Sequence, residues 1–170
     1  MPNGTKALWR SGYERKIREF LEIHRIPFVY EGHTLSITVK ESPGTFCMAC
    51  GSSACYRHSK YTPDFYFPNT GVYMEAKGKF DARARVIAVA MKEQHPSIDY
   101  RILLQRDNWM TSTKAQRYSD WLKKKQIPYA VGQYPPMDWV TNTHGSSGSP
   151  SGGSSRGANF TVPTATSRRY

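Results

Sequence analysis

The chain has 170 residues and a formal net charge of +11 at pH 7, because 24 Lys and Arg residues outnumber 13 Asp and Glu residues. A basic surplus of this size favours a polyanionic partner, nucleic acid before an anionic membrane, although solubility alone would also account for it. No apolar run is long enough to span a bilayer and the N-terminus lacks an apolar signal segment, so we expect no membrane contact and a cytoplasmic location.

The first predicted element is an amphipathic helix in the segment SGYERKIREFLEIHRI, which follows a loose N-terminus over residues 1–10. Its apolar side chains recur at helical spacing: Tyr13, Ile17 and Leu21, with Phe20 beside them. Ser11 and Glu14 form an S-x-x-E capping box at its start. Pro27 then directs the next residues, FVY, into an extended segment.

Short strands and two further helices are predicted along the rest of the chain. HTLSITV alternates as a half-buried strand does, and DFYF and VYMEAK are predicted strands around a PNTG turn. Asp81 caps a predicted helix over ARARVIAVAMKEQ, whose inward face we expect to contain Val86, Ile87, Ala90 and Met91. YRILL and IPYAV are predicted strands, and TKAQRYSDWLKKKQ is a predicted third helix. This order predicts a mixed α/β fold, a small central mixed sheet flanked by helices.

The predicted domain covers residues 11–140, with residues 41–60 as an inserted Cys/His-rich segment that shows no period. From residue 141 to 170 the composition changes to Gly, Ser and Thr, and no acidic residue remains. Such a composition cannot bury a core, so we expect a disordered tail there.

The predicted strand pair carries charges where apolar residues are usual. Asp64 begins its first strand, and Glu75 and Lys77 lie two residues apart on the second, so they project from the same face. The turn brings Asp64 back towards Glu75. Paired carboxylates hold Mg²⁺, which polarises a phosphoryl oxygen and acidifies a bound water. A neighbouring lysine can orient or deprotonate that water, or stabilise the phosphate.

These residues therefore indicate metal-assisted phosphodiester hydrolysis. The alternative is an exposed salt bridge between Glu75 and Lys77, with Asp64 serving as a turn residue after Pro63. A short charged pattern recurs by chance, and its place on a strand hairpin that precedes a basic helix favours the nuclease interpretation.

A second cluster, CMACGSSACYRH, spaces three thiols and an imidazole as a structural zinc site does. The predicted ligands are Cys47, Cys50, Cys55 and His58. Bound Zn²⁺ would stabilise a loop without a core of its own; free thiols and an adventitious disulfide are the alternatives. An odd number of cysteines suits a reducing cytosol. The basic and aromatic residues nearby could add a nucleic-acid contact: Arg57, His58 and Lys60 with Tyr56 or Tyr61.

Four segments in order carry a family resemblance: RSGYERKI, YTPDFYFPNTGVYMEAKGKF, KEQHPSIDYRILL and PPMDWV. Together they resemble the bacteriophage endonuclease I family, resolvases of four-way (Holliday) DNA junctions within the PD-(D/E)-x-K nuclease superfamily. The likeness extends from about Arg10 to Val140. The cysteine cluster, and one additional residue in the PNTG turn, depart from that family's usual pattern.

The resemblance implies a restriction-endonuclease-like fold and a catalytic set of Glu14, Asp64, Glu75 and Lys77. Mg²⁺ or Mn²⁺ would be held by Asp64, Glu75 and the Ala76 carbonyl, with Glu14 completing a second metal site, and Lys77 would act on the water. It also implies a homodimer with exchanged strands, in which Glu14 comes from one subunit and the other three residues from its partner. The substrate would be branched DNA of a phage or prophage, cut to leave 5′-phosphate ends and recognised by shape and phosphates.

Six basic residues are candidates for DNA phosphate contacts, although each could equally face solvent: Arg10, Arg15, Arg18, Lys79, Arg83 and Arg85. Two other functions fit the same residues. One is a sequence-specific or homing-type PD-(D/E)-x-K endonuclease. The other is a non-catalytic, zinc-dependent nucleic-acid-binding module.

Overall fold

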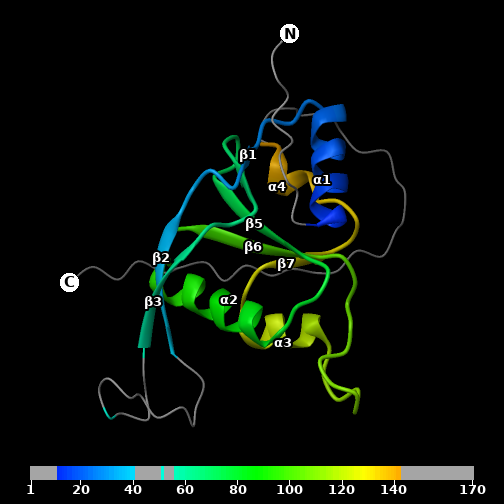
Figure 1. The fold of residues 1–170 in the computed structure, drawn as a ribbon. Coiled ribbons are helices and arrows are strands. Elements are labelled where there is room, and N and C mark those ends of the chain that lie inside the picture. The colour runs from blue at the N-terminus through cyan, green and yellow to red at the C-terminus, as the bar shows by residue number, and fades with distance from the viewer. Residues whose placement is uncertain (1–10, 41–50, 52–55, 143–170) are drawn as a thin grey trace, which may run out of the picture.

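The computed structural model describes residues 11–40, 51 and 56–142, and Figure 1 shows how their elements are arranged. The elements run in the order α1 (Gly12–Ile23), β1 (Val29–Tyr30), β2 (Leu35–Lys40), β3 (Tyr56–Tyr61), β4 (Phe65–Phe67), β5 (Val72–Lys77), α2 (Ala82–Gln94), β6 (Asp99–Leu104), α3 (Tyr118–Lys124), β7 (Tyr129–Val131) and α4 (Met137–Val140). Within these ranges no helix has the length and apolar character that crossing a bilayer requires.

The central sheet is mixed, as predicted. Its described strands lie in the order β1-β4-β5-β6-β7. β4 pairs antiparallel with β1 and β5, whereas β6 pairs parallel with β5 and β7. The carboxyl ends of β5, β6 and β7 therefore meet at one edge of the sheet, and it is outside such ends that open α/β sheets usually bind ligands.

Helices cover both faces of this sheet (Figure 1). α1 and α4 contribute to one apolar cluster: Tyr13, Ile17, Leu21, Trp139 and Val140. α2 and α3 contribute to the other: Ala88, Ala90, Met91, Tyr118 and Leu122. Side chains alternate along a strand, so Leu103 of β6 lies in the first cluster while Ile102 and Leu104 lie in the second. The mixed α/β fold with helices on both faces is confirmed.

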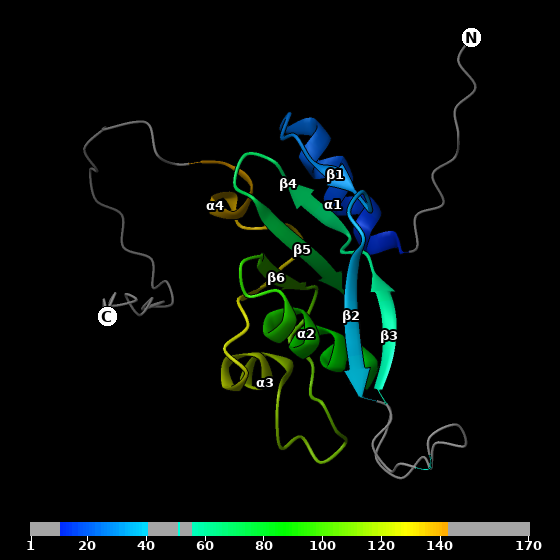
Figure 2. The same ribbon diagram turned by 90° about the vertical axis from the view of Figure 1, so that its left-hand side faces the viewer.

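β2 and β3 form a separate two-stranded antiparallel sheet beside α2 (Figure 2). The sequence predicted β2 but not β3, because YRHSKY is polar and shows no apolar alternation. The Gln94 side chain fixes this hairpin to α2, accepting a hydrogen bond from the Thr38 amide at 2.7 Å and donating to the Thr38 carbonyl at 2.6 Å. Ile37 is buried between them.

Two helix predictions need correction. The third helix begins at Tyr118, not at residue 113, because the Asp107 carboxylate accepts hydrogen bonds from the amide and hydroxyl of Ser119 and holds the preceding segment as a loop. On α2, Val86 is 45% exposed and Ala88 is buried instead. Val86 lines an open cavity, while Ala88 meets the sheet. The PPMDWV segment, not predicted as a helix, forms the short α4.

Candidate active site

The turn between β4 and β5 places two carboxylates side by side. Its closing residue, Gly71, has φ +73, a conformation that other residues rarely adopt. Phe65 pairs with Met74, so Asp64 lies opposite Glu75 as predicted. The Asp64 amide donates to Glu75 Oε2 at 3.3 Å, and the Ala76 amide donates to Asp64 Oδ2 at 2.8 Å.

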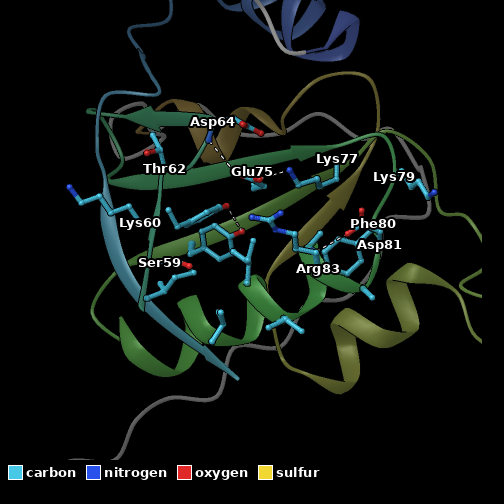
Figure 3. A pocket seen from close by; sticks show the side chains of 18 of the residues that line it. Ser59, Lys60, Thr62, Asp64, Glu75, Lys77, Lys79, Phe80, Asp81 and Arg83 are labelled. Carbon is cyan, nitrogen blue, oxygen red and sulfur yellow. Dashed lines mark hydrogen bonds and ion pairs between the residues drawn. The ribbon is translucent and has the colours of Figure 1, made fainter. Parts of the chain in front are cut away.

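Lys77 and Glu14 complete the predicted set. Lys77 Nζ forms an ion pair with Glu75 Oε1, and Figure 3 shows both side chains beside Asp64. Glu14 comes from the first turn of α1, where its amide donates to Ser11 Oγ as a capped helix requires. Its carboxylate accepts hydroxyl hydrogen bonds from Ser11 and Tyr30, both at 2.7 Å. All four predicted side chains line one cavity.

Glu14 belongs to the same chain as the other three residues. The family resemblance implies instead that Glu14 is supplied by a partner subunit. Here one chain brings Glu14, Asp64, Glu75 and Lys77 to a single cavity. An equivalent site built from two chains with exchanged strands stays a prediction.

The cavity has a volume of about 960 Å³ and is open to solvent. The β2–β3 hairpin and the first turn of α2 flank it (Figure 3). Besides the carboxylates, the cavity is lined by six basic side chains: Lys40, Arg57, Lys60, Lys77, Lys79 and Arg83. A phosphate backbone would meet cations on several sides of the buried acids.

Burial sets the electrostatics of the acids. Together with the negative charge of Glu75, burial raises the pKa of Asp64 to about 8, because the nearby Lys77 charge and the hydrogen bond from the Ala76 amide offset only part of the rise. Burial lowers the pKa of Lys77, but the charges of Glu75 and Asp64 outweigh it, so the pKa lies above its usual 10.5. Burial and the charge of Glu75 thus make a second negative charge at the acid pair unfavourable, and a divalent cation would stabilise the form in which both carboxylates are ionised.

Two carboxylates and a carbonyl suit Mg²⁺, which is commonly bound through one or two carboxylates and keeps several waters. Asp64, Glu75 and the carbonyl of Ala76 therefore fit the cation. Within the described ranges, no cluster of three or more His, Cys, Asp or Glu residues forms a ready metal site. The carboxylate oxygens of Glu14 accept hydrogen bonds from Ser11 and Tyr30, and its charge raises the pKa of Asp64.

Two tyrosines lie close to the acids; the sequence predicted Tyr61 only as a possible nucleic-acid contact and did not predict Tyr100 as a site residue. The hydroxyls of Tyr61, at the end of β3, and Tyr100, on β6, lie 2.9 Å apart. Burial, with Glu75 nearby, raises the pKa of each well above its usual value. Their contact joins the β2–β3 hairpin to the central sheet near Glu75. Only their aromatic character was visible in the sequence, and that indicates burial, not position.

The six basic residues predicted to contact DNA phosphates lie in different parts of the protein. Lys79 and Arg83 line the cavity. Arg15 and Arg18 lie on the outer face of α1 and pair with Glu19 and Glu22. The remaining two are Arg85, which donates to the Phe80 carbonyl, and Arg10, which lies outside the described residues.

The predicted zinc site cannot be placed, since Cys47, Cys50 and Cys55 lie outside the described residues. His58 is on β3, and its Nδ1 lies 2.9 Å from the Thr38 hydroxyl on the paired strand. The other ring nitrogen of His58 takes no part in that contact. Zinc binding stays a prediction, as does the disordered tail, nearly all of which is also outside the described residues.

Comparison with known proteins connects the site to one family. The family model described as Phage endonuclease I matches residues 3–149. The chain is 30% identical over 123 residues to a protein named Endodeoxyribonuclease 1 from Enterobacteria phage T3, over 72% of this chain and 70% of that protein. It is 29% identical over 133 residues to Endonuclease I of Escherichia phage T7, over 78% of each chain. Residues 3–149, which the family model matches, include Glu14, Asp64, Glu75 and Lys77.

Proposed function

Because the chain belongs to the phage endonuclease I family, we propose that it is a divalent-metal-dependent endonuclease that cuts branched DNA, including four-way junctions. The observation that carries the proposal is the buried acid pair, Asp64 and Glu75, at the centre of a cavity lined by cations. Membership of the family supports DNA endonuclease activity, and the acid pair supports metal-assisted hydrolysis as its mechanism. The enzyme would act in the cytoplasm of a phage-infected or prophage-carrying bacterium.

Asp64, Glu75 and the carbonyl of Ala76 would hold Mg²⁺ or Mn²⁺, with Glu14 near enough for its charge to act on Asp64. When bound, the cation would polarise the scissile phosphate and lower the pKa of a water. The acids themselves fix the site, because Asp64 is held by the Ala76 amide and Glu75 by the Asp64 amide.

Lys77 would stabilise the negative charge of the phosphate that is cut. Although burial lowers the pKa of Lys77, the charges of Glu75 and Asp64 raise it, and its ammonium would stabilise the negative charge of the phosphate. Its ion pair with Glu75 holds the ammonium beside the acids. Lys79 and Arg83, at the entrance to α2, would bind neighbouring phosphates and orient the strand.

A homodimer suits a branched substrate, because two symmetric sites can cut paired strands. We propose that the active protein is such a dimer, with strands exchanged as the family resemblance implies. Cutting would leave 5′-phosphate and 3′-hydroxyl ends. Recognition by shape requires that cations contact backbone phosphates and that base sequence matter little.

The proposal is tested with a synthetic four-way junction and a linear duplex of the same arm sequence, each incubated with Mg²⁺ or with chelator. We expect cutting of the junction only with the metal, in symmetric strand pairs, with 5′-phosphate on the products. Equal cutting of the linear duplex at one defined sequence would instead indicate a sequence-specific endonuclease. Tight junction binding without any metal-dependent cut would indicate a binding module.

A further inference from the structure

A second cavity lies at the same edge of the sheet as the acids. Its volume is about 740 Å³, and it opens beside the carboxyl ends of β6 and β7, where Gln105, Arg106, Gln133 and Tyr134 follow the strands. α1 forms its other side through Lys16, Phe20, Ile23 and His24. We name this space the strand-end cavity.

The strand-end cavity adjoins the catalytic residues through the backbone. The Gln105 amide donates to the Lys77 carbonyl at 2.9 Å, so the first residue after β6 is hydrogen-bonded to the last residue of β5. α1 also connects the two spaces, since Glu14 lines the first cavity and Lys16 the second. A DNA strand whose scissile phosphate is bound at the catalytic cavity would therefore pass near the strand-end cavity.

Stacked aromatic rings form the wall of this cavity. The rings of Phe20 and Tyr134 are stacked, with centroids 4.5 Å apart and planes inclined by 18°. His24 extends the group, with its ring centroid 4.2 Å from that of Phe20. Tyr134 is nonetheless 47% exposed. Because Phe20 covers one face of the Tyr134 ring, the opposite face is the one on which a base could stack.

Polar groups around the rings match a nucleotide. Lys16 and Arg106 are cations, and the amides of Gln105 and Gln133 can pair with base edges. The acid in the lining, Glu19, is paired with Arg15 on the solvent side of α1. Aromatic faces combined with cations are the usual means of binding an unpaired base and its phosphate.

We propose that the strand-end cavity binds an unpaired nucleotide of the DNA, its base stacked on Tyr134, next to the bond that is cut. This rests on the proposed function, and it gives the enzyme a physical means of preferring branched DNA. A continuous duplex keeps its bases stacked on one another, whereas a branch point offers a base that can leave the stack. Charge complementarity with a basic chain, and the hydrogen bond that joins Gln105 of this cavity to Lys77 of the catalytic cavity, favour DNA over a protein partner as the occupant.

The experiment compares Tyr134→Ala with Tyr134→Phe, which keeps the ring, in full-length protein that also carries Glu75→Gln so that the DNA stays intact. The probes are a forked DNA with 2-aminopurine at the first unpaired position, and the same sequence as a fully paired duplex. We expect Tyr134→Ala to weaken fork binding about tenfold or more, as the loss of one base–aromatic stack implies. Duplex affinity should be unchanged, Tyr134→Phe should bind as its parent does, and 2-aminopurine fluorescence should be quenched in every protein except Tyr134→Ala.

Three outcomes, in a parent protein that does bind DNA, would overturn this proposal alone. Equal affinity of Tyr134→Ala and its parent for the fork would leave the ring without a role in binding. An equal loss for fork and duplex would make Tyr134 a general contact. Concentration-dependent self-association that Tyr134→Ala abolishes, with fork binding unchanged, would assign the cavity to a second copy of the chain. If the parent protein binds neither the fork nor the duplex, the proposed endonuclease function fails as well. This result therefore distinguishes failure of the proposed function from failure of the base-binding proposal alone.

Discussion

Replacing Glu75 with glutamine should lower the rate of junction cutting at least about 100-fold, the loss seen when one charge-stabilising group leaves an active site. Glutamine keeps the shape of the side chain and an oxygen that can accept from the Asp64 amide. It removes the charge that pairs with Lys77 and that would bind the cation. Junction affinity should change by less than about threefold, because phosphate contacts dominate it.

The cutting rate is measured under single-turnover conditions and the affinity by gel shift or anisotropy. Glu93→Gln is the matched control, since Glu93 is an exposed acid on α2 that lies outside the catalytic cavity. It should cut as the wild type does. Wild-type cutting by Glu75→Gln would remove the acid pair from the chemistry.

Phe65→Ala should lower the free energy of unfolding by about 3–5 kcal/mol, the usual cost of removing a buried aromatic ring. Phe65 is 0% exposed on β4, immediately after Asp64. Its ring packs edge-on against Tyr30, with centroids 5.4 Å apart, and lies parallel to that of Phe67. The loss of this packing would also loosen the backbone that holds Asp64.

Denaturant unfolding of the two proteins measures the difference. Val86→Ala is the control, because Val86 is 45% exposed, and it should change the free energy of unfolding by no more than about 0.5 kcal/mol. An effect of Phe65→Ala as small as that of the control would mean that β4 is not part of the stable core.

Local patterns predicted most of the fold. Helical spacing of Tyr13, Ile17 and Leu21 placed α1 and its buried face correctly. The Pro-Asn-Thr-Gly turn fixed the β4–β5 pair, because a short turn determines the pairing of its own strands. β3 was missed because its sequence is polar and its partner strand lies beyond a long segment. Burial of Ala88 instead of Val86 depends on what covers α2, which local periodicity does not contain.

The candidate site also contains residues that local sequence could predict and residues that it could not. Asp64, Glu75 and Lys77 could be predicted because they lie within one hairpin, where sequence distance fixes spatial distance. The contact between Tyr61 and Tyr100 near Glu75 could not be predicted, since it depends on how the β2–β3 hairpin packs on the sheet. The same holds for the strand-end cavity, which combines residues of α1 with those that follow β6 and β7.

Divalent cations are the partner on which the whole account depends, and calorimetric titration of Mn²⁺ into metal-free protein measures their binding directly. We expect saturable binding by the wild type and by Glu93→Gln, and at least about tenfold weaker binding by Asp64→Asn, which keeps the side-chain shape but lacks the charge that binds the metal. Equal affinity of Asp64→Asn and the wild type would contradict the account, because the cation would then be bound somewhere other than between Asp64 and Glu75.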